Sequence, residues 1–254
     1  MVLHSGNILL FGGSQSKKKC LQLDDGTWKA HSTLNELRIA HSSVSTQTAT
    51  FVFGGAGDSS TTYEYLPKDS TVWLMGKTDI PEGFTYGCAI EVKSGQEIWL
   101  IGGWTGKRIL SFNINDHSFE VLPSQLNMER VGPKCAIIPN SKKVMITGGS
   151  NPGNHFKCLN STEILDINTG SVHMASPMNY KRVDHGMGYL TINNKNTLAV
   201  FGGNSGRKML DSVELYNTET KKWVRTSMRL KEPKAIYSFL NIKLSEIISK
   251  IQDA

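Results

Sequence analysis

The sequence has no apolar run close to the roughly 20 residues that a membrane-spanning helix needs, so no membrane partner is predicted. Its opening, MVLHSGNILLFGG, lacks the basic segment and long apolar stretch of a secretory signal, which predicts a protein of the cytoplasm or the nucleus. Proline is scarce at 8 residues, and the 24 glycines do not follow the three-residue period of a collagen. Apolar residues form 39% of the 254 positions, which excludes an intrinsically disordered chain and predicts one sizeable core.

Cysteine is also scarce. The 4 cysteines are Cys20, Cys88, Cys135 and Cys158. They form no CxxC motif, and none has a histidine at the spacing of zinc ligands. The sequence therefore predicts no metal site and no cofactor. An even number permits disulfides, but a chain of this length in a reducing compartment favours buried free thiols.

An internal repeat organises the chain. Five Gly-Gly pairs each end a short apolar run, at residues 7–13, 50–55, 98–103, 144–149 and 198–203. A polar loop and a second strand-like segment follow each pair, at residues 20–23, 62–65, 109–112, 162–165 and 212–216. A turn then leads to an apolar or aromatic residue at one recurring place, namely Trp28, Trp73, Phe119, Val172 and Trp223.

Each unit predicts a small antiparallel sheet. A continuous apolar run is typical of a strand that is buried on both faces, and glycine lets a neighbouring backbone approach its end. Such a sheet cannot bury its faces alone, whereas several sheets stacked around an axis cover one another. We therefore expect an all-β propeller, with Trp28, Trp73 and Trp223 in the core between its blades.

The order of apolar strand, Gly-Gly, tyrosine or similar residue and later tryptophan resembles the kelch repeat over residues 1–242. The resemblance implies a kelch-type β-propeller of about five four-stranded blades, with a truncated six-bladed ring as the alternative. Residues 235–242 are predicted to close the ring by pairing into the N-terminal blade. Residues 243–254 are predicted to form a C-terminal amphipathic helix or tail, because Leu244, Ile247, Ile248 and Ile251 follow helical spacing.

The resemblance also implies that partner peptides are held on one face, where the loops after Gly-Gly meet the loops that enter each blade. In this chain the loops after Gly-Gly are rich in lysine and arginine, and Asp58 is their one acid. A basic face attracts acidic ligands. The predicted function is that of a protein-interaction module, a monomer that binds an acidic or phosphorylated segment of a partner. A role as a substrate-recognition adaptor is implied only if a further domain is present.

Eight residues are candidates for contact with this partner. Arginine makes paired contacts with carboxylates and phosphates, and aromatic side chains anchor interfaces. The candidates are Arg38, Tyr86, Trp104, Arg108, Arg130, Arg182, His185 and Arg207. For Arg38, Arg130 and Arg182, bonding to backbone carbonyls is an equal alternative. For His185, the alternative is a hydrogen-bonded residue at the start of a strand.

The alternative function is a sialidase-like or other carbohydrate-active propeller that binds a carboxylated sugar, with Tyr86, Tyr180 and Asp184 as its candidates. The sequence offers it little support, because residues 24–28 only superficially resemble the aspartate box of sialidases and lack its spacing. Other enzyme classes are not indicated either, since the chain has no GxSxG motif and no glycine-rich phosphate loop. No enzymatic activity is therefore predicted. Nucleic acid is not predicted as a partner either, because a net charge of +6 supports only weak, salt-sensitive binding.

Overall fold

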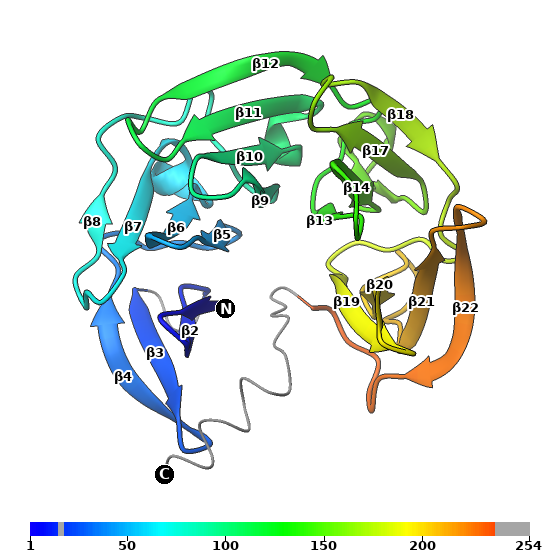
Figure 1. Ribbon diagram of the computed structural model, residues 1–254, viewed down its shortest axis with the longest axis horizontal. Coiled ribbons are helices and arrows are strands. Elements are labelled where there is room, and N and C mark those ends of the chain that lie inside the picture. The colour runs from blue at the N-terminus through cyan, green and yellow to red at the C-terminus, as the bar shows by residue number, and fades with distance from the viewer. Residues whose placement is uncertain (15–17, 237–254) are drawn as a thin grey trace.

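Five four-stranded antiparallel sheets are arranged around a central channel in this computed structural model, which describes residues 1–14 and 18–236 (Figure 1). Blade 1 consists of β1 (Val2–His4), β2 (Asn7–Phe11), β3 (Lys19–Asp24) and β4 (Thr27–Thr33). Blade 2 consists of β5 (Ser42–Ser45), β6 (Ala49–Phe53), β7 (Tyr63–Pro67) and β8 (Leu74–Met75). Blade 3 consists of β9 (Cys88–Lys93), β10 (Glu97–Ile101), β11 (Arg108–Asn113) and β12 (Phe119–Gln125). Blade 4 consists of β13 (Lys134–Ile137), β14 (Lys143–Thr147), β17 (Thr162–Asp166) and β18 (Val172–Ala175). Blade 5 consists of β19 (Gly186–Ile192), β20 (Lys195–Phe201), β21 (Ser212–Asn217) and β22 (Lys222–Arg229).

The five apolar runs form the second strand of every blade, as the repeat predicts. All five residues of β6 are buried, because neighbouring blades cover both faces of its sheet. The Gly-Gly pair then turns the chain sharply: Gly54 has φ +63°, and a Cβ there would collide with the carbonyl of Phe84. An all-β propeller of five blades is thus confirmed.

The core lies between successive blades. Trp73 of blade 2 is 3% exposed and packs with Leu9 and Phe11 of blade 1, and Trp223 is 6% exposed in the cluster that joins blade 5 to blade 4. Each of these tryptophans covers the preceding blade. The expectation for Trp28 is wrong, because this side chain of blade 1 is 42% exposed. No buried cluster of the described residues joins blade 1 to blade 5.

Inter-blade loops dock on the glycine pairs in the same way around the ring. The second glycine of each pair donates its N–H to a carbonyl of the following inter-blade loop, at 2.8–2.9 Å. The acceptors are the carbonyls of Arg38, Phe84, Arg130, Arg182 and Lys234. These bonds place the loops after Gly-Gly and the inter-blade loops on one face, which we call the loop face.

Of residues 235–242, which were predicted to close the ring, the structure describes 235 and 236. Blade 1 takes all four of its strands from residues 2–33, so residues 235–242 are not needed to complete it. Residues 237–242 and the helix predicted at 243–254 lie outside the described residues. Within the described part of the chain, no helix has the length and apolarity that a bilayer crossing requires.

Candidate functional site

Three of the predicted contact residues, Arg38, Arg130 and Arg182, are 0% exposed. Their guanidinium groups form ion pairs with buried glutamates at 2.9–3.0 Å, and each also donates to the carbonyl of the first glycine of a pair. The glutamate partners are Glu64, Glu163 and Glu214. Such contacts satisfy the charge of each arginine inside one blade. Their assignment as partner-binding residues is therefore wrong, and the backbone-bonding alternative describes them.

Blade 3 replaces this ion pair with an apolar one. Phe84 holds the place of the arginine and Leu110 that of the glutamate, and both are at most 2% exposed in one core cluster. Pro81, which has no N–H, stands where the other loops have an asparagine whose N–H donates to the glutamate. Comparison of the repeats could have revealed the structural role of the arginines, because all three residue types change together.

His185 is also 0% exposed, so its prediction as a partner-binding residue is wrong. Its Nε2 lies 2.8 Å from the Thr147 hydroxyl, which agrees with the alternative of a hydrogen-bonded residue at the start of a strand. Burial lowers the pKa of His185 well below its ordinary value, and the cations Lys134 and Arg182 lower it further. A buried, neutral imidazole has no charge to offer an anionic ligand, and its hydrogen bond with Thr147 stabilises the fold.

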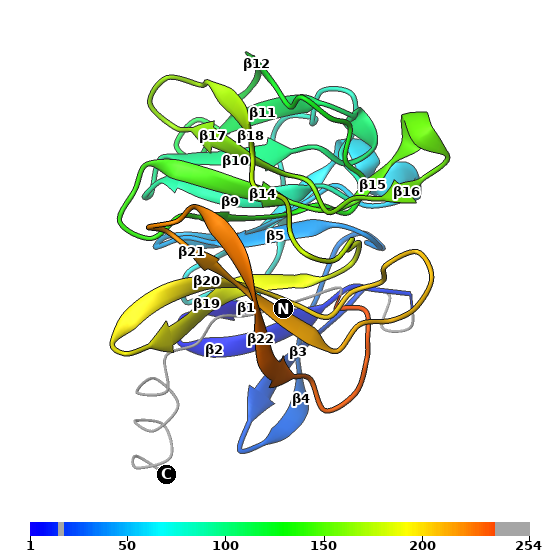
Figure 2. The same cartoon turned by 90° about the vertical axis from the view of Figure 1, so that its right-hand side faces the viewer.

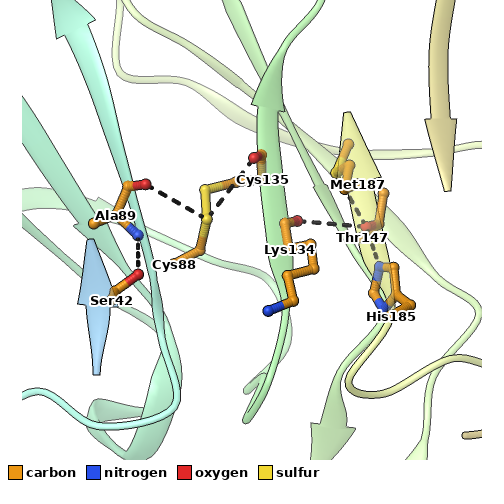
Figure 3. The surroundings of a disulfide bond; sticks show 8 residues. All are labelled: Ser42, Cys88, Ala89, Lys134, Cys135, Thr147, His185 and Met187. Atoms are coloured by element: carbon orange, nitrogen blue, oxygen red, sulfur yellow. Dashed lines mark hydrogen bonds between the residues drawn. A yellow bond between two sulfur atoms is a disulfide. The ribbon is translucent and has the colours of Figure 1, made fainter. Parts of the chain in front are cut away.

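A cavity of about 620 Å³ opens at the channel, lined by the inner strands and the inter-blade loops. Tyr86, Lys134 and Asp184 line it together with His41 and serines of the first blades, and Figure 3 shows Lys134 beside a disulfide bond in the channel wall. Lys134 forms no ion pair with a described residue. Burial lowers the pKa of its ammonium group, which nearby Asp184 opposes, and burial raises the pKa of Asp184. The channel can therefore hold a small polar ligand.

The disulfide joins Cys88 on β9 to Cys135 on β13, with their Cα atoms 6.0 Å apart (Figure 3). The prediction of free thiols is wrong for this pair, although Cys20 and Cys158 are free. The two cysteines meet because they occupy neighbouring inner strands of blades 3 and 4. At the preceding junction the Ala89 N–H donates to the Ser42 hydroxyl at 2.9 Å. Neighbouring blades are thus joined near the channel by a disulfide at one junction and by a hydrogen bond at the preceding one.

The remaining four candidates lie at the surface of the loop face. Tyr86 is 39% and Trp104 57% exposed, and Arg108 and Arg207 are also accessible. Arg108 is paired with Glu82 of an inter-blade loop. The inter-blade loops therefore add acids to a face whose other loops are basic.

Phe156, which was not predicted as a site residue, is 49% exposed and lies against Trp104 with ring centroids 5.6 Å apart. Phe156 lies within the longest of the five loops after a central strand, residues 148–161. The length of this insertion is the signal in the sequence that could have drawn attention to it. In the described residues, no group of three or more His, Cys, Asp or Glu side chains is arranged to hold a metal ion.

Comparison with known proteins supports the fold. No protein-family model matches the chain, and no curated protein matches it. Among solved structures, the chain is similar to one titled "Structure of YjhT", with a TM-score of 0.71 and 14% sequence identity over 88% of this chain and 81% of that one. The molecule thus belongs to the structural class of β-propellers.

Proposed function

We propose that this propeller is a kelch-type protein-interaction module that binds an acidic or phosphorylated segment of a partner on its loop face. One observation carries the proposal: exposed cations of blades 3 to 5 have no ion-pair partner among the described residues. They are Lys107, Lys157, Arg207 and Lys208. Because their charges are not neutralised within the molecule, they attract carboxylates and phosphates. If the partner is a substrate of a larger assembly, the module acts as its recognition adaptor.

The buried arginines change where this binding is expected. Arg38, Arg130 and Arg182 would have focused the positive charge at the mouth of the channel, but the fold uses all three internally. Accessible cations remain on the loops after Gly-Gly, and the inter-blade loop before β19 adds the exposed Lys181. The acidic segment is therefore expected to lie across the outer part of the loop face, over blades 3 to 5.

Charge reversal tests this proposal. The triple variant Lys157→Glu, Arg207→Glu, Lys208→Glu is expected to lose at least about tenfold in affinity for acidic peptides selected by the wild type from a random phage library. Fluorescence anisotropy at low and moderate salt measures the effect. The matched control reverses Lys195 and Lys222, which are exposed on β20 and β22. Equal affinity of the triple variant and the wild type would contradict the proposal, as would selected peptides without an excess of acids.

The channel supports a second candidate, the binding of a carboxylated sugar. The observation that favours it is the cavity, whose lining includes Lys134, Tyr86 and Asp184. An ammonium group without an ion-pair partner can take a carboxylate, and the phenol and carboxyl groups can bond sugar hydroxyls.

Saturation-transfer NMR with sialic acid tests this second candidate. The wild type is expected to show transfer to the sugar, and Lys134→Met is expected to reduce it several-fold because the counter-charge is lost. Lys143→Met, at an exposed position of β14, is the control. Absence of transfer with the wild type would refute a sugar site in the channel.

A further inference from the structure

Trp104 and Phe156 form an exposed aromatic pair on the loop face, which we call the aromatic ridge. They are 57% and 49% exposed, and their rings meet at 62°. Trp104 belongs to the turn η2 (Gly103–Thr105) of blade 3, whereas Phe156 belongs to blade 4. Two large aromatic rings that touch each other and still face solvent are typical of the anchor points of protein interfaces.

An extra structural element of blade 4 carries Phe156 at the surface. The loop after its Gly-Gly pair forms an additional hairpin, β15 (Ser150–Asn151) and β16 (Lys157–Cys158), which projects from the loop face in Figure 2. Ser150 exchanges two backbone hydrogen bonds with Val131, of 2.8 and 2.9 Å, which fixes the base of the hairpin. Blade 5 has a shorter counterpart, in which Asn204 bridges Val183 and Met209, and no other blade forms a two-stranded sheet at this place among the described residues.

The tip of this hairpin holds an unfavourable conformation. His155 and Phe156 follow each other with φ values of 49° and 53°, in the left-handed region that residues with a Cβ rarely adopt. Backbone strain of this kind clusters at binding sites, where the surrounding structure maintains it. Here the strained backbone holds the Phe156 ring at the surface, 49% exposed. Among the described residues, its aromatic contact is with Trp104.

Positive charge surrounds the ridge. Lys107 follows Trp104 in the chain and Lys157 follows Phe156, and both are exposed. The loop of blade 5 lies against the hairpin at Gly206, where a Cβ would be 3.2 Å from the Cys158 sulfur, and the exposed Arg207 and Lys208 follow Gly206 in the chain.

One acid, Glu129, lies at the base of the ridge. Its Oε2 would be 3.2 Å from a Cβ at Gly153 of the hairpin. Cations thus predominate in the loops that carry and border the two rings. This arrangement is complementary to an apolar side chain within an acidic segment.

We propose that the aromatic ridge is the anchor site for a partner segment in which one large apolar side chain is flanked by acidic residues. The apolar side chain packs on Trp104 and Phe156, and the flanking carboxylates meet Lys107, Lys157, Arg207 and Lys208. This inference rests on the proposed function and specifies where on the loop face the acidic segment binds. It also specifies that charge alone is not sufficient for recognition.

Two synthetic acidic peptides that are identical except for a central Leu or Ala are the probes. The wild type is expected to bind the Leu peptide at least about tenfold more tightly than the Ala peptide, because only the leucine side chain reaches the ridge. Trp104→Ala and Phe156→Asn are each expected to abolish this preference and to leave binding of the Ala peptide unchanged. Asparagine is chosen because it tolerates the left-handed conformation of position 156.

Trp28→Ala is the matched control, because Trp28 is 42% exposed but belongs to blade 1. This variant is expected to keep the full preference for the Leu peptide. If the wild type binds both peptides equally and charge reversal removes both, the ridge is refuted while the proposed function stands. If the wild type binds neither peptide, the proposed function fails together with the ridge.

Discussion

Replacing Glu163 by leucine alone is expected to destabilise the protein by about 3–5 kcal/mol. The Arg130 guanidinium, 0% exposed, would lose the carboxylate that it meets at 2.9 Å. The backbone N–H groups of Asn127 and Met128 also donate to this carboxylate, at 2.6 and 3.2 Å, and would lose their acceptor. An unpaired buried charge costs far more than the pair contributes when it is intact. Urea denaturation at neutral pH measures the loss.

A compensated variant separates the cost of an unpaired charge from the cost of a changed core. The triple variant Asn127→Pro, Arg130→Phe, Glu163→Leu gives blade 4 the residues that blade 3 has as Pro81, Phe84 and Leu110. It is expected to recover most of the lost stability, to within about 1–2 kcal/mol of the wild type, because apolar groups of suitable size can replace a buried ion pair.

The control for both variants is Glu120→Leu, at an exposed position of β12, with an expected change within about 0.5 kcal/mol. The structural role of the ion pair would be contradicted if Glu163→Leu unfolded at the urea concentration of the wild type. A triple variant no more stable than the single one would show that the repeats are not interchangeable at this position.

Removing the disulfide by Cys88→Ser with Cys135→Ser is expected to cost about 2–4 kcal/mol of stability. The bond closes a loop of 47 residues and links two inner strands of the channel wall, so its loss frees the unfolded chain and weakens one junction between blades. Thermal unfolding should show a lower midpoint, by about 2–4 °C for each kcal/mol.

Reduction provides a second test of the same bond. Dithiothreitol is expected to lower the melting temperature of the wild type to that of the double variant and to leave the double variant unchanged. Cys158→Ser, which removes a free thiol, is the control and should melt as the wild type does. Titration of four thiols in the unreduced, denatured wild type would show that the bond does not form.

The periodic part of the structure could be predicted from the sequence. Central strands, glycine turns and blade number depend on short-range patterns that recur five times, and each pattern has a local physical cause. The same register predicted burial of Trp28, Trp73 and Trp223, which is correct for Trp73 and Trp223 but wrong for Trp28. A tryptophan at this place is buried only if a neighbouring blade covers it, and no local pattern of residues specifies that neighbour.

The candidate site could be predicted only in part. Trp104 and Arg207 were placed on the loop face, but the three arginines were assigned to a partner although glutamates within their own blades bind them. Arginine pairs with an internal and an external carboxylate by the same chemistry. The choice between the two depends on which strand lies beside the loop.

Local sequence patterns specify a ring of small sheets, because strand periodicity and glycine turns are properties of adjacent residues. Which side chains remain free to contact a partner depends on the three-dimensional packing. It paired Cys88 with Cys135, enclosed the arginines with their glutamates, and brought Phe156 against Trp104. Each of these contacts joins residues at least 26 positions apart, so it depends on the packing of strands and blades and not on local sequence.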